Sequence, residues 1–175
     1  MENIIVSLIC IALMVVGGMT MSQGFLSSVD SSVGGWQDMG VRNEEIMRTD
    51  LATLDTSLPA SNILEVSLSN SGQTKLNDFA DWDVIVQYYA DGSVYYVKWL
   101  PYTAGTPGDN QWTVKGIYTD ADSETTEVFE PGILNPGEEI IIRAKLNPSV
   151  GRKTTNLVIV STPNGVSASI AFYRN

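Results

Sequence analysis

The sequence predicts an α+β protein, in which one long N-terminal hydrophobic-to-amphipathic α-helix is followed by an immunoglobulin-like antiparallel β-sandwich. Residues 4–21 carry no charge and are almost wholly apolar, which favours a helix that is buried or embedded in a membrane. Apolar side chains then recur at steps of three and four as far as residue 58, as on one face of a helix. From residue 60 the period changes to the alternation that is typical of half-buried strands. We therefore expect two domains, a helix over residues 1–58 and a β-sandwich over residues 60–175.

The apolar run Ile4–Met21 is the first element, and it cannot remain in water. At about 1.5–2 kcal/mol for each large apolar side chain, its exposure would cost on the order of 20 kcal/mol. A whole domain is stable by only about 5–15 kcal/mol, so the rest of the chain could not compensate. The run is close to the roughly 20 residues that cross a bilayer as a helix. We expect it to lie in lipid or among other protein chains.

A targeting segment is the alternative explanation of this run. A secretory signal peptide is disfavoured, because no Lys or Arg precedes Ile4 and no A-x-A-like cleavage site follows Met21. Basic residues usually mark the cytoplasmic side of a membrane helix, yet the first basic residue here is Arg42. Either the chain inserts without that signal, or a basic leader was removed before Met1.

Small residues within the apolar run predict close contact with neighbouring helices. Glycines such as Gly17 and Gly18 weaken an isolated helix by up to about 1 kcal/mol each relative to Ala. They also let the backbones of two helices approach closely. We expect many copies of the chain to bundle through one polymerisation core, formed by Ile4, Ile5, Leu8, Ile9, Ile11, Ala12, Leu13, Val15, Val16, Gly17, Gly18, Met19, Phe25 and Val29.

The second part of the predicted helix carries a single apolar stripe. Its members recur every three or four positions, at Phe25, Val29, Val33 and Trp36 and again at Met47, Leu51, Leu54 and Leu58. Pro59 cannot continue a helix, because it lacks the backbone N–H and clashes with the preceding turn. We therefore expect the helix to end near residue 57.

Residues 60–175 show the alternation and the turn chemistry of a β-sandwich. Asp91–Gly92 and Asn164–Gly165 are two-residue hairpin signals. About seven or eight short strands at 8–12-residue spacing favour an immunoglobulin-like arrangement. We expect strands near residues 64–68, 83–90, 93–100, 112–118, 125–129, 138–146, 155–161 and 166–173.

The composition argues against several classes of function. The chain has 20 Asp+Glu against 10 Lys+Arg, and its net charge of −10 repels nucleic acid. It contains no His, so Ser-His-Asp and Cys-His catalytic arrangements cannot be built. Cys10 is the only cysteine and lies within the apolar run. We expect no enzymatic activity and no cofactor.

One acidic loop is the single candidate for a metal site. Asp120, Asp122 and Glu124 place oxygen ligands at alternating positions, as calcium-binding loops do. The loop lacks the central Gly and the distant bidentate Glu of such sites. We therefore expect no metal, and keep these three residues as the candidate ligands.

Aromatic residues gather on one predicted hairpin. An exposed aromatic patch could bind carbohydrate or a partner subunit. A sandwich core with cross-strand aromatic pairs is the alternative, and we favour it. The residues concerned are Tyr88, Tyr89, Tyr95, Tyr96, Trp99 and Tyr102.

Two tracts carry a resemblance to a known group of proteins. The N-terminal tract IIVSLICIALMVVGGMTMSQGFLSS and the C-terminal pattern ILNPGEEIIIRAKLNPSVGRKTTNLVIVSTPNGVSASIAF resemble the archaellins and the related archaeal type IV pilins. The resemblance covers the whole chain at the level of architecture. In that family a leader peptidase removes a short basic leader, and an assembly platform draws the subunits from the membrane. The N-terminal helices then bundle into the filament core, and the β-domains form its outer sheath.

The resemblance implies a structural subunit of an extracellular helical filament for motility, inserted in the membrane before assembly. Its partners would be many copies of itself, the leader peptidase and the assembly platform, and no nucleic acid. Many bacterial type IV pilins carry Glu at the fifth mature position, whereas this sequence has Ile5, which favours the archaeal type. An adhesive pilus subunit shares this layout. So does a membrane-anchored archaellum stator-like module that binds through its β-sandwich, and both remain alternatives.

Overall fold

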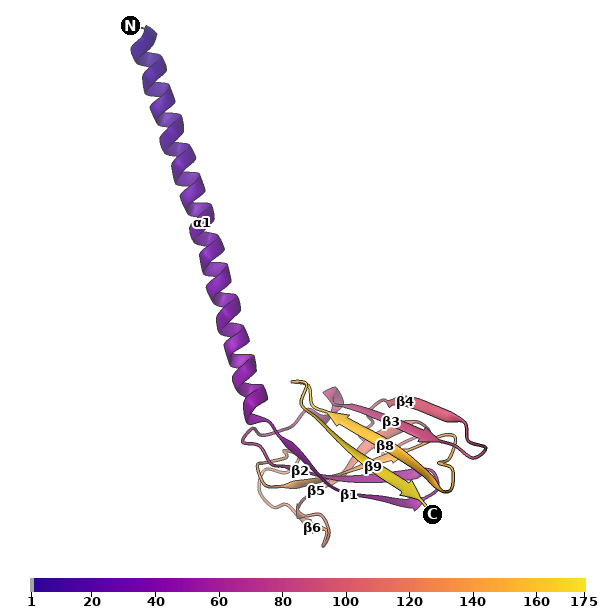
Figure 1. Cartoon of the computed structure of the whole chain (residues 1–175). Helices are drawn as coiled ribbons and strands as arrows, with labels where there is room; N and C mark the ends of the chain where they lie inside the picture. Colours follow the sequence, from indigo (N-terminus) through magenta and orange to yellow (C-terminus); the bar gives the residue numbers. More distant parts are fainter. Residues whose placement is uncertain (1) are drawn as a thin grey trace. The chain divides into compact units, whose positions relative to one another are not determined.

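The computed structural model describes residues 2–175, with side chains from Asn3 onward. A long helix, α1, precedes nine strands and one short 3₁₀ helix, η1, in this part of the chain (Figure 1). The predicted fold class, a long N-terminal helix followed by an antiparallel β-sandwich, is confirmed. The elements are α1 Glu2–Arg48, β1 Leu51–Ala60, β2 Ile63–Asn70, η1 Phe79–Asp81, β3 Asp83–Tyr89, β4 Tyr95–Leu100, β5 Gln111–Asp120, β6 Thr125–Thr126, β7 Glu139–Lys145, β8 Thr154–Ser161 and β9 Ser167–Arg174.

The helix is shorter than the sequence indicated. It stops at Arg48 rather than near residue 57, and the next ten residues of regular structure form strand β1. The boundary predicted between residues 58 and 60 therefore falls too late in the chain, inside the first hairpin of the sandwich. By its internal contacts the chain divides into two compact units, Met1–Glu44 and Glu45–Asn175.

A β-bulge explains why the leucine spacing suggested a helix. Side chains alternate between the two faces of a strand, so Leu51 and Leu58, an odd number of positions apart, would point to opposite faces of a regular strand. The pairing of β1 with β2 shifts between Thr53 and Asp55, which leaves Leu54 in a bulge. Leu51 is buried, Leu58 packs against the core and Leu54 stays exposed. The extra residue reproduces helix-like spacing within a strand.

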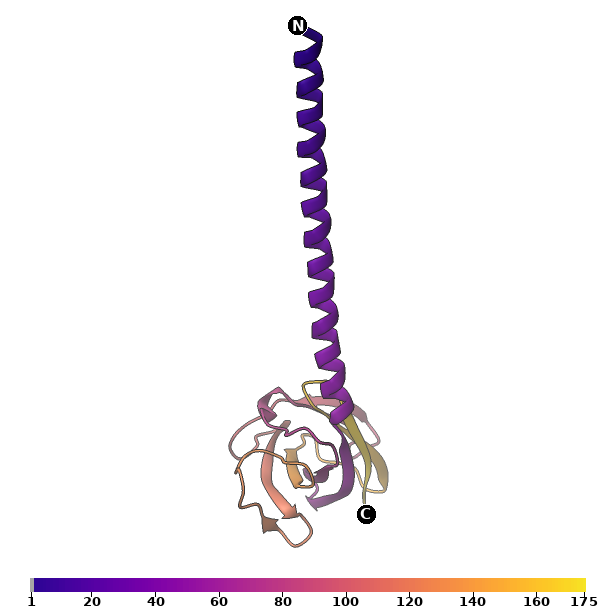
Figure 2. The same ribbon diagram turned by 90° about the vertical axis from the view of Figure 1, so that its left-hand side faces the viewer.

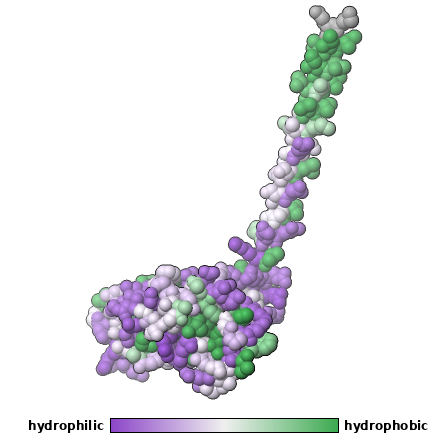
Figure 3. All heavy atoms as spheres, turned by 180° about the vertical axis from the view of Figure 1, so that it is seen from behind, coloured by the Kyte–Doolittle hydropathy of each residue, from purple (hydrophilic) through white to green (hydrophobic). Residues whose placement is uncertain are grey.

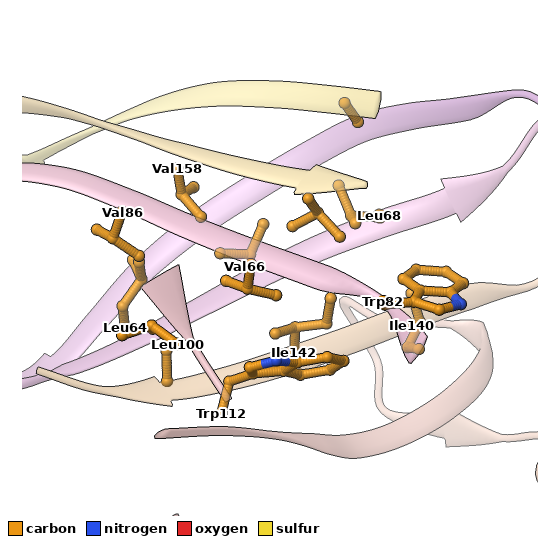
Figure 4. Packing of buried hydrophobic residues seen from close by; sticks show 14 of the residues in the cluster. Leu64, Val66, Leu68, Trp82, Val86, Leu100, Trp112, Ile140, Ile142 and Val158 are labelled. Carbon is orange, nitrogen blue, oxygen red and sulfur yellow. The ribbon is translucent and has the colours of Figure 1, made fainter. Parts of the chain in front are cut away.

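The strands form two antiparallel sheets that pack face to face. One sheet has the order β1-β2-β7-β5-β6 and the other β4-β3-β8-β9. In Figure 2 the sandwich is seen from one end, with the strands arranged around its interior. Trp112 of β5 is fully buried and meets Tyr102 edge-on, with ring centroids 4.9 Å apart. Figure 4 shows further members of this core, among them Leu64, Val66, Leu68, Trp82, Val86, Leu100, Ile140, Ile142 and Val158.

Both predicted hairpin turns are confirmed. Asp91–Gly92 lies in the turn between β3 and β4, and Asn164–Gly165 lies in the turn between β8 and β9, each closed by a backbone hydrogen bond of 2.9 Å. The φ angles of Gly92 and Gly165 are +87° and +91°, which a side chain would make unfavourable. The strand predicted over residues 125–129 is reduced to Thr125–Thr126 in β6.

Candidate functional surfaces

The residues that the sequence assigned to a polymerisation core all lie on α1, and all of them are exposed in the single chain. The exposed fraction is 70% for both Ile4 and Phe25. Figure 3 shows that apolar atoms cover the N-terminal part of the helix, whereas polar atoms are interspersed further along. Among the described residues, Asn3–Arg48 is the one helix long and apolar enough to cross a membrane. Burial of these side chains against other copies stays a prediction.

Polar and small residues of α1 suit apolar surroundings. The Thr20 hydroxyl donates to the carbonyl oxygens of Val16 and Gly17 at 3.1 and 2.9 Å, so the helix satisfies it internally. A Cβ atom placed on Gly17 or Gly18 would meet no other atom within 4 Å. The packing of the chain itself therefore does not require glycine there, and close approach by a second helix is the reason we expect.

The junction, which we define as residues 48–50, is held by a neighbouring loop. Four amides of loop 71–74 donate in pairs to its backbone. The first two bind the carbonyl oxygen of Asp50 at 3.1 and 3.2 Å, and the last two bind that of Arg48 at 2.7 and 3.2 Å. A Cβ atom on Gly72 would lie 2.5 Å from the Asp50 nitrogen and 2.6 Å from the Arg48 oxygen. Only glycine allows this approach.

The second sheet holds the same junction through one side chain. Asn164, in the turn between β8 and β9, donates from Nδ2 to the Thr49 hydroxyl oxygen at 2.8 Å. Thr49 is only 5% exposed, and its hydroxyl donates to the carbonyl oxygen of Glu45 at 2.8 Å. Loop 71–74 follows β2 of the five-stranded sheet, so both sheets fix the point where the chain leaves α1. The sequence predicted the Asn164–Gly165 turn but not this contact, because nothing local connects it to Thr49.

The three carboxylates of the candidate metal loop do not converge. Asp120 Oδ1 accepts hydrogen bonds from the backbone N–H groups of Ser123 and Asp122, which lower the pKa of its carboxyl. Glu124 points to Lys115 instead, with Oε1 2.7 Å from Nζ, and this hydrogen bond lowers the pKa of Glu124. Residues 3–175 contain no group of three or more His, Cys, Asp or Glu side chains that could hold a metal ion.

The outer face of the five-stranded sheet carries an ion-pair network. Glu65 of β2 lies 2.6 Å from Arg143 of β7 and 3.3 Å from Lys115 of β5. Lys115 also binds Glu124, and that hydrogen bond raises the pKa of the lysine. Because Glu65 is only 9% exposed, its charge needs such partners. These four charged side chains pair with one another within the domain.

The four-stranded sheet presents a different outer face, which we call the apolar face. Its one carboxylate, Asp83, accepts a hydrogen bond of 2.7 Å from the indole N–H of Trp99. Trp99, Val97 and Tyr95 of β4 are 59%, 58% and 50% exposed. The outward residues are Asp83, Ile85, Gln87, Tyr89, Tyr95, Val97, Trp99, Thr155, Leu157, Ile159, Ser161, Ser167, Ser169, Ala171 and Tyr173.

Some aromatic residues of the β3–β4 hairpin belong to the sandwich core, and others form an exposed patch. Tyr88 is fully buried and stacks on Tyr96 at 5.7 Å, as expected of a sandwich core. Tyr89, Tyr95 and Trp99 lie on the apolar face instead. Sequence reasoning missed the contribution of β8 and β9 to that face, because β3 pairs with β8 across a long sequence separation.

Comparison with known proteins identifies the sandwich. A family model described as "Conserved flagellar protein F, immunoglobulin-like domain" matches residues 49–172 and thus begins where α1 ends. A search of curated proteins finds no match. The chain is similar to the archaellum periplasmic stator protein complex of FlaF and FlaG from Sulfolobus acidocaldarius, with a TM-score of 0.51, 20% identity and coverage of 70% of this chain and 87% of that one.

Two further structures resemble the chain. The periplasmic stator protein FlaG from Sulfolobus acidocaldarius has a TM-score of 0.51 and 21% identity, covering 71% of this chain and 99% of that one. The archaeal flagellum of Methanospirillum hungatei strain JF1 has a TM-score of 0.55 and 12% identity, covering 97% of this chain and 91% of that one. At such identities these likenesses establish the shared fold alone.

Proposed function

Since the chain belongs to the family of the conserved flagellar protein F immunoglobulin-like domain, we propose that it is a membrane-anchored stator-type component of the archaellum. The family match over residues 49–172 carries the flagellar part of this proposal, and the likeness of the fold to the FlaF and FlaG stator structures supports the stator part. Together they favour the stator-like alternative over the filament subunit that the sequence tracts implied. The family is one of flagellar proteins and not of enzymes, in keeping with a binding or structural role.

In this proposal the N-terminal part of α1 is the anchor. The apolar residues between Ile4 and Met21 contact lipid, and the Thr20 hydroxyl is already satisfied by backbone carbonyls. The first charged side chain after the run is Asp30, so a span of about 20 residues that starts at Ile4 ends before any charged residue. The β-sandwich then lies outside the membrane, where it grips the cell-wall layer as a stationary binding module.

Fractionation and microscopy test this proposal. We would tag the full chain in the archaeon that carries it, shear the filaments from the cells, and measure the tagged chain in the membrane and filament fractions. The expected result is a chain retained in the membrane fraction, and a deletion strain that assembles filaments but does not swim. A chain that dominates the long polymers would refute the proposal.

A filament subunit is the second candidate, and one observation favours it. The archaeal flagellum structure covers 97% of this chain, which includes α1, whereas the stator structures cover about 70%. In a filament, the exposed residues of α1 would be buried by neighbouring helices. Gly17→Leu should then abolish filaments while the sandwich still folds, whereas a lipid-embedded anchor should tolerate it. Electron microscopy of sheared material from this variant separates the two candidates.

A further inference from the structure

A shallow groove lies at one end of the apolar face. It has a volume of about 360 Å³ and draws on β3, β4, β8 and β9. We call it the aromatic groove, and it is lined by Gln87, Tyr89, Tyr95, Thr155, Leu157 and Ala171, together with the buried Asn156. Its lining residues come from four neighbouring strands of one sheet, so the backbone hydrogen bonds between these strands hold the groove in shape.

Two tyrosine rings line the aromatic groove. Tyr89 and Tyr95 are directly paired across the strands, and their ring centroids lie 5.0 Å apart at an angle of 48°. They are 40% and 50% exposed, so a large part of each ring is available to a ligand. The backbone N–H of Tyr89 donates to Oδ1 of the buried Asn156 at 2.9 Å, and the Tyr95 hydroxyl donates to Gln87 Oε1 at 2.9 Å. The first bond holds the backbone of Tyr89, and the second orients the Tyr95 side chain toward Gln87.

The polar groups of the aromatic groove suit a ligand rich in hydroxyl groups. Within residues 3–175, the Tyr89 hydroxyl, the Thr155 hydroxyl and the Gln87 amide nitrogen have no protein partner. The groove is lined also by the apolar side chain of Leu157 and by the two tyrosine rings. A ligand that binds here must offer both an apolar face and hydrogen-bonding groups at its edge.

The absence of charged side chains from the groove lining limits the kinds of ligand that could bind there. No Asp, Glu, Lys or Arg lines the groove, although the chain carries a net charge of −10 and the opposite sheet face bears an ion-pair network. A membrane surface would call for Lys or Arg beside the apolar residues, and none is present in the groove. An anionic ligand would have no cation to pair with. The ligand should therefore be neutral.

We infer that the aromatic groove binds neutral carbohydrate. The C–H face of a sugar ring would lie on Tyr89 and Tyr95, and its hydroxyl groups would bond to Gln87 and Thr155. This inference rests on the proposed function, because it names the chemistry that a module gripping the cell-wall layer would recognise. A second copy of this chain is the competing occupant, since an uncharged apolar face could also pair with itself.

The test measures binding of neutral oligosaccharides to the full chain in nanodiscs of uncharged lipid. Hexamers of glucose, mannose and galactose serve as probes, and binding is followed by calorimetry and tyrosine fluorescence. We expect saturable binding of at least one probe, and a loss of about tenfold or more in affinity for Tyr95→Ala, as for an aromatic residue central to a site. Tyr95→Phe keeps the ring and should lose only a few-fold. Phe129→Ala is the matched control, because Phe129 is 73% exposed but lies after β6, outside the groove.

Each outcome decides the inference. Absence of binding by all three probes, or equal affinity of Tyr95→Ala and the unmodified chain, would overturn it. So would concentration-dependent dimers that Tyr95→Ala abolishes, since these would assign the groove to a second copy. Gln87→Ala leaves both rings in place and should also weaken binding, which protects the test from a folding defect in Tyr95→Ala. The assay uses purified protein, so its failure leaves the localisation test of the proposed function unaffected.

Discussion

Replacing Gly72 with Ala should loosen the junction between α1 and the sandwich. The new Cβ atom would lie 2.5 Å from the Asp50 nitrogen and 2.6 Å from the Arg48 oxygen, both backbone atoms that cannot turn aside. Relief of this clash requires loop 71–74 to move away, which breaks its four hydrogen bonds to residues 48 and 50. At about 0.5–1.5 kcal/mol for each bond, we expect a loss of roughly 2–6 kcal/mol in the free energy of unfolding.

The assay is thermal unfolding of the full chain in detergent, followed by near-ultraviolet circular dichroism. A loss of this size should lower Tm by about 6–30 °C, at roughly 3–5 °C for each kcal/mol. Gly105→Ala is the matched control, because its Cβ atom would meet nothing within 4 Å and its φ is not in the left-handed region. That variant should stay within about 1 kcal/mol of the unmodified chain. Equal melting of the two variants would refute the reasoning.

Three further predictions concern the sandwich. Trp112→Ala leaves a cavity in the fully buried core and should cost about 3–5 kcal/mol, measured by urea unfolding. Burial raises the pKa of Tyr88 to about 12, so a spectrophotometric titration should include an ionisation near pH 12, and Tyr88→Phe should remove it. The same variant loses the 3.0 Å hydrogen bond to the Pro148 carbonyl and should lower stability by about 1 kcal/mol. The hydrogen bond from Lys145 lowers the pKa of Asp109 in the folded chain. The ionised Asp109 therefore stabilises the fold at a pH above about 3.9, its pKa in the unfolded chain, and this stabilisation is lost as the pH falls through the lower pKa of the folded chain. Asp109→Asn should therefore lose less stability on acidification below about pH 4 than the unmodified chain does, and an unchanged acid profile would contradict this.

Short stretches of sequence were sufficient to predict the N-terminal helix and the hairpin turns. The uncharged run Ile4–Met21 cannot remain exposed to water, and Asp91–Gly92 has the backbone freedom that a tight hairpin requires. Strand β1 was missed because a bulge at Leu54 gave its leucines helical spacing. A single extra residue in a strand leaves no signature that distinguishes it from one face of a helix.

The candidate surfaces were harder to predict, because they arise from strands far apart in the sequence. Tyr95 could be recognised as one of a group of aromatic residues, but Leu157 and Ala171 join it only through the pairing of β3 with β8 and of β8 with β9. The contacts at the junction could not be predicted from the sequence for the same reason. Gly72 and Asn164 look like ordinary turn residues, and only the folded chain shows that both contact residues 48–50.

The junction and the apolar face suggest how force would pass through an anchored module that resists a turning filament. Under the proposed function, force enters at the ligand-binding face of the sandwich and leaves through residues 48–50 into α1. Loop 71–74 follows the five-stranded sheet and Asn164 belongs to the four-stranded sheet, so a pull on either sheet reaches the junction directly. Several hydrogen bonds must then break together before the chain extends, which resists force better than bonds that break one at a time.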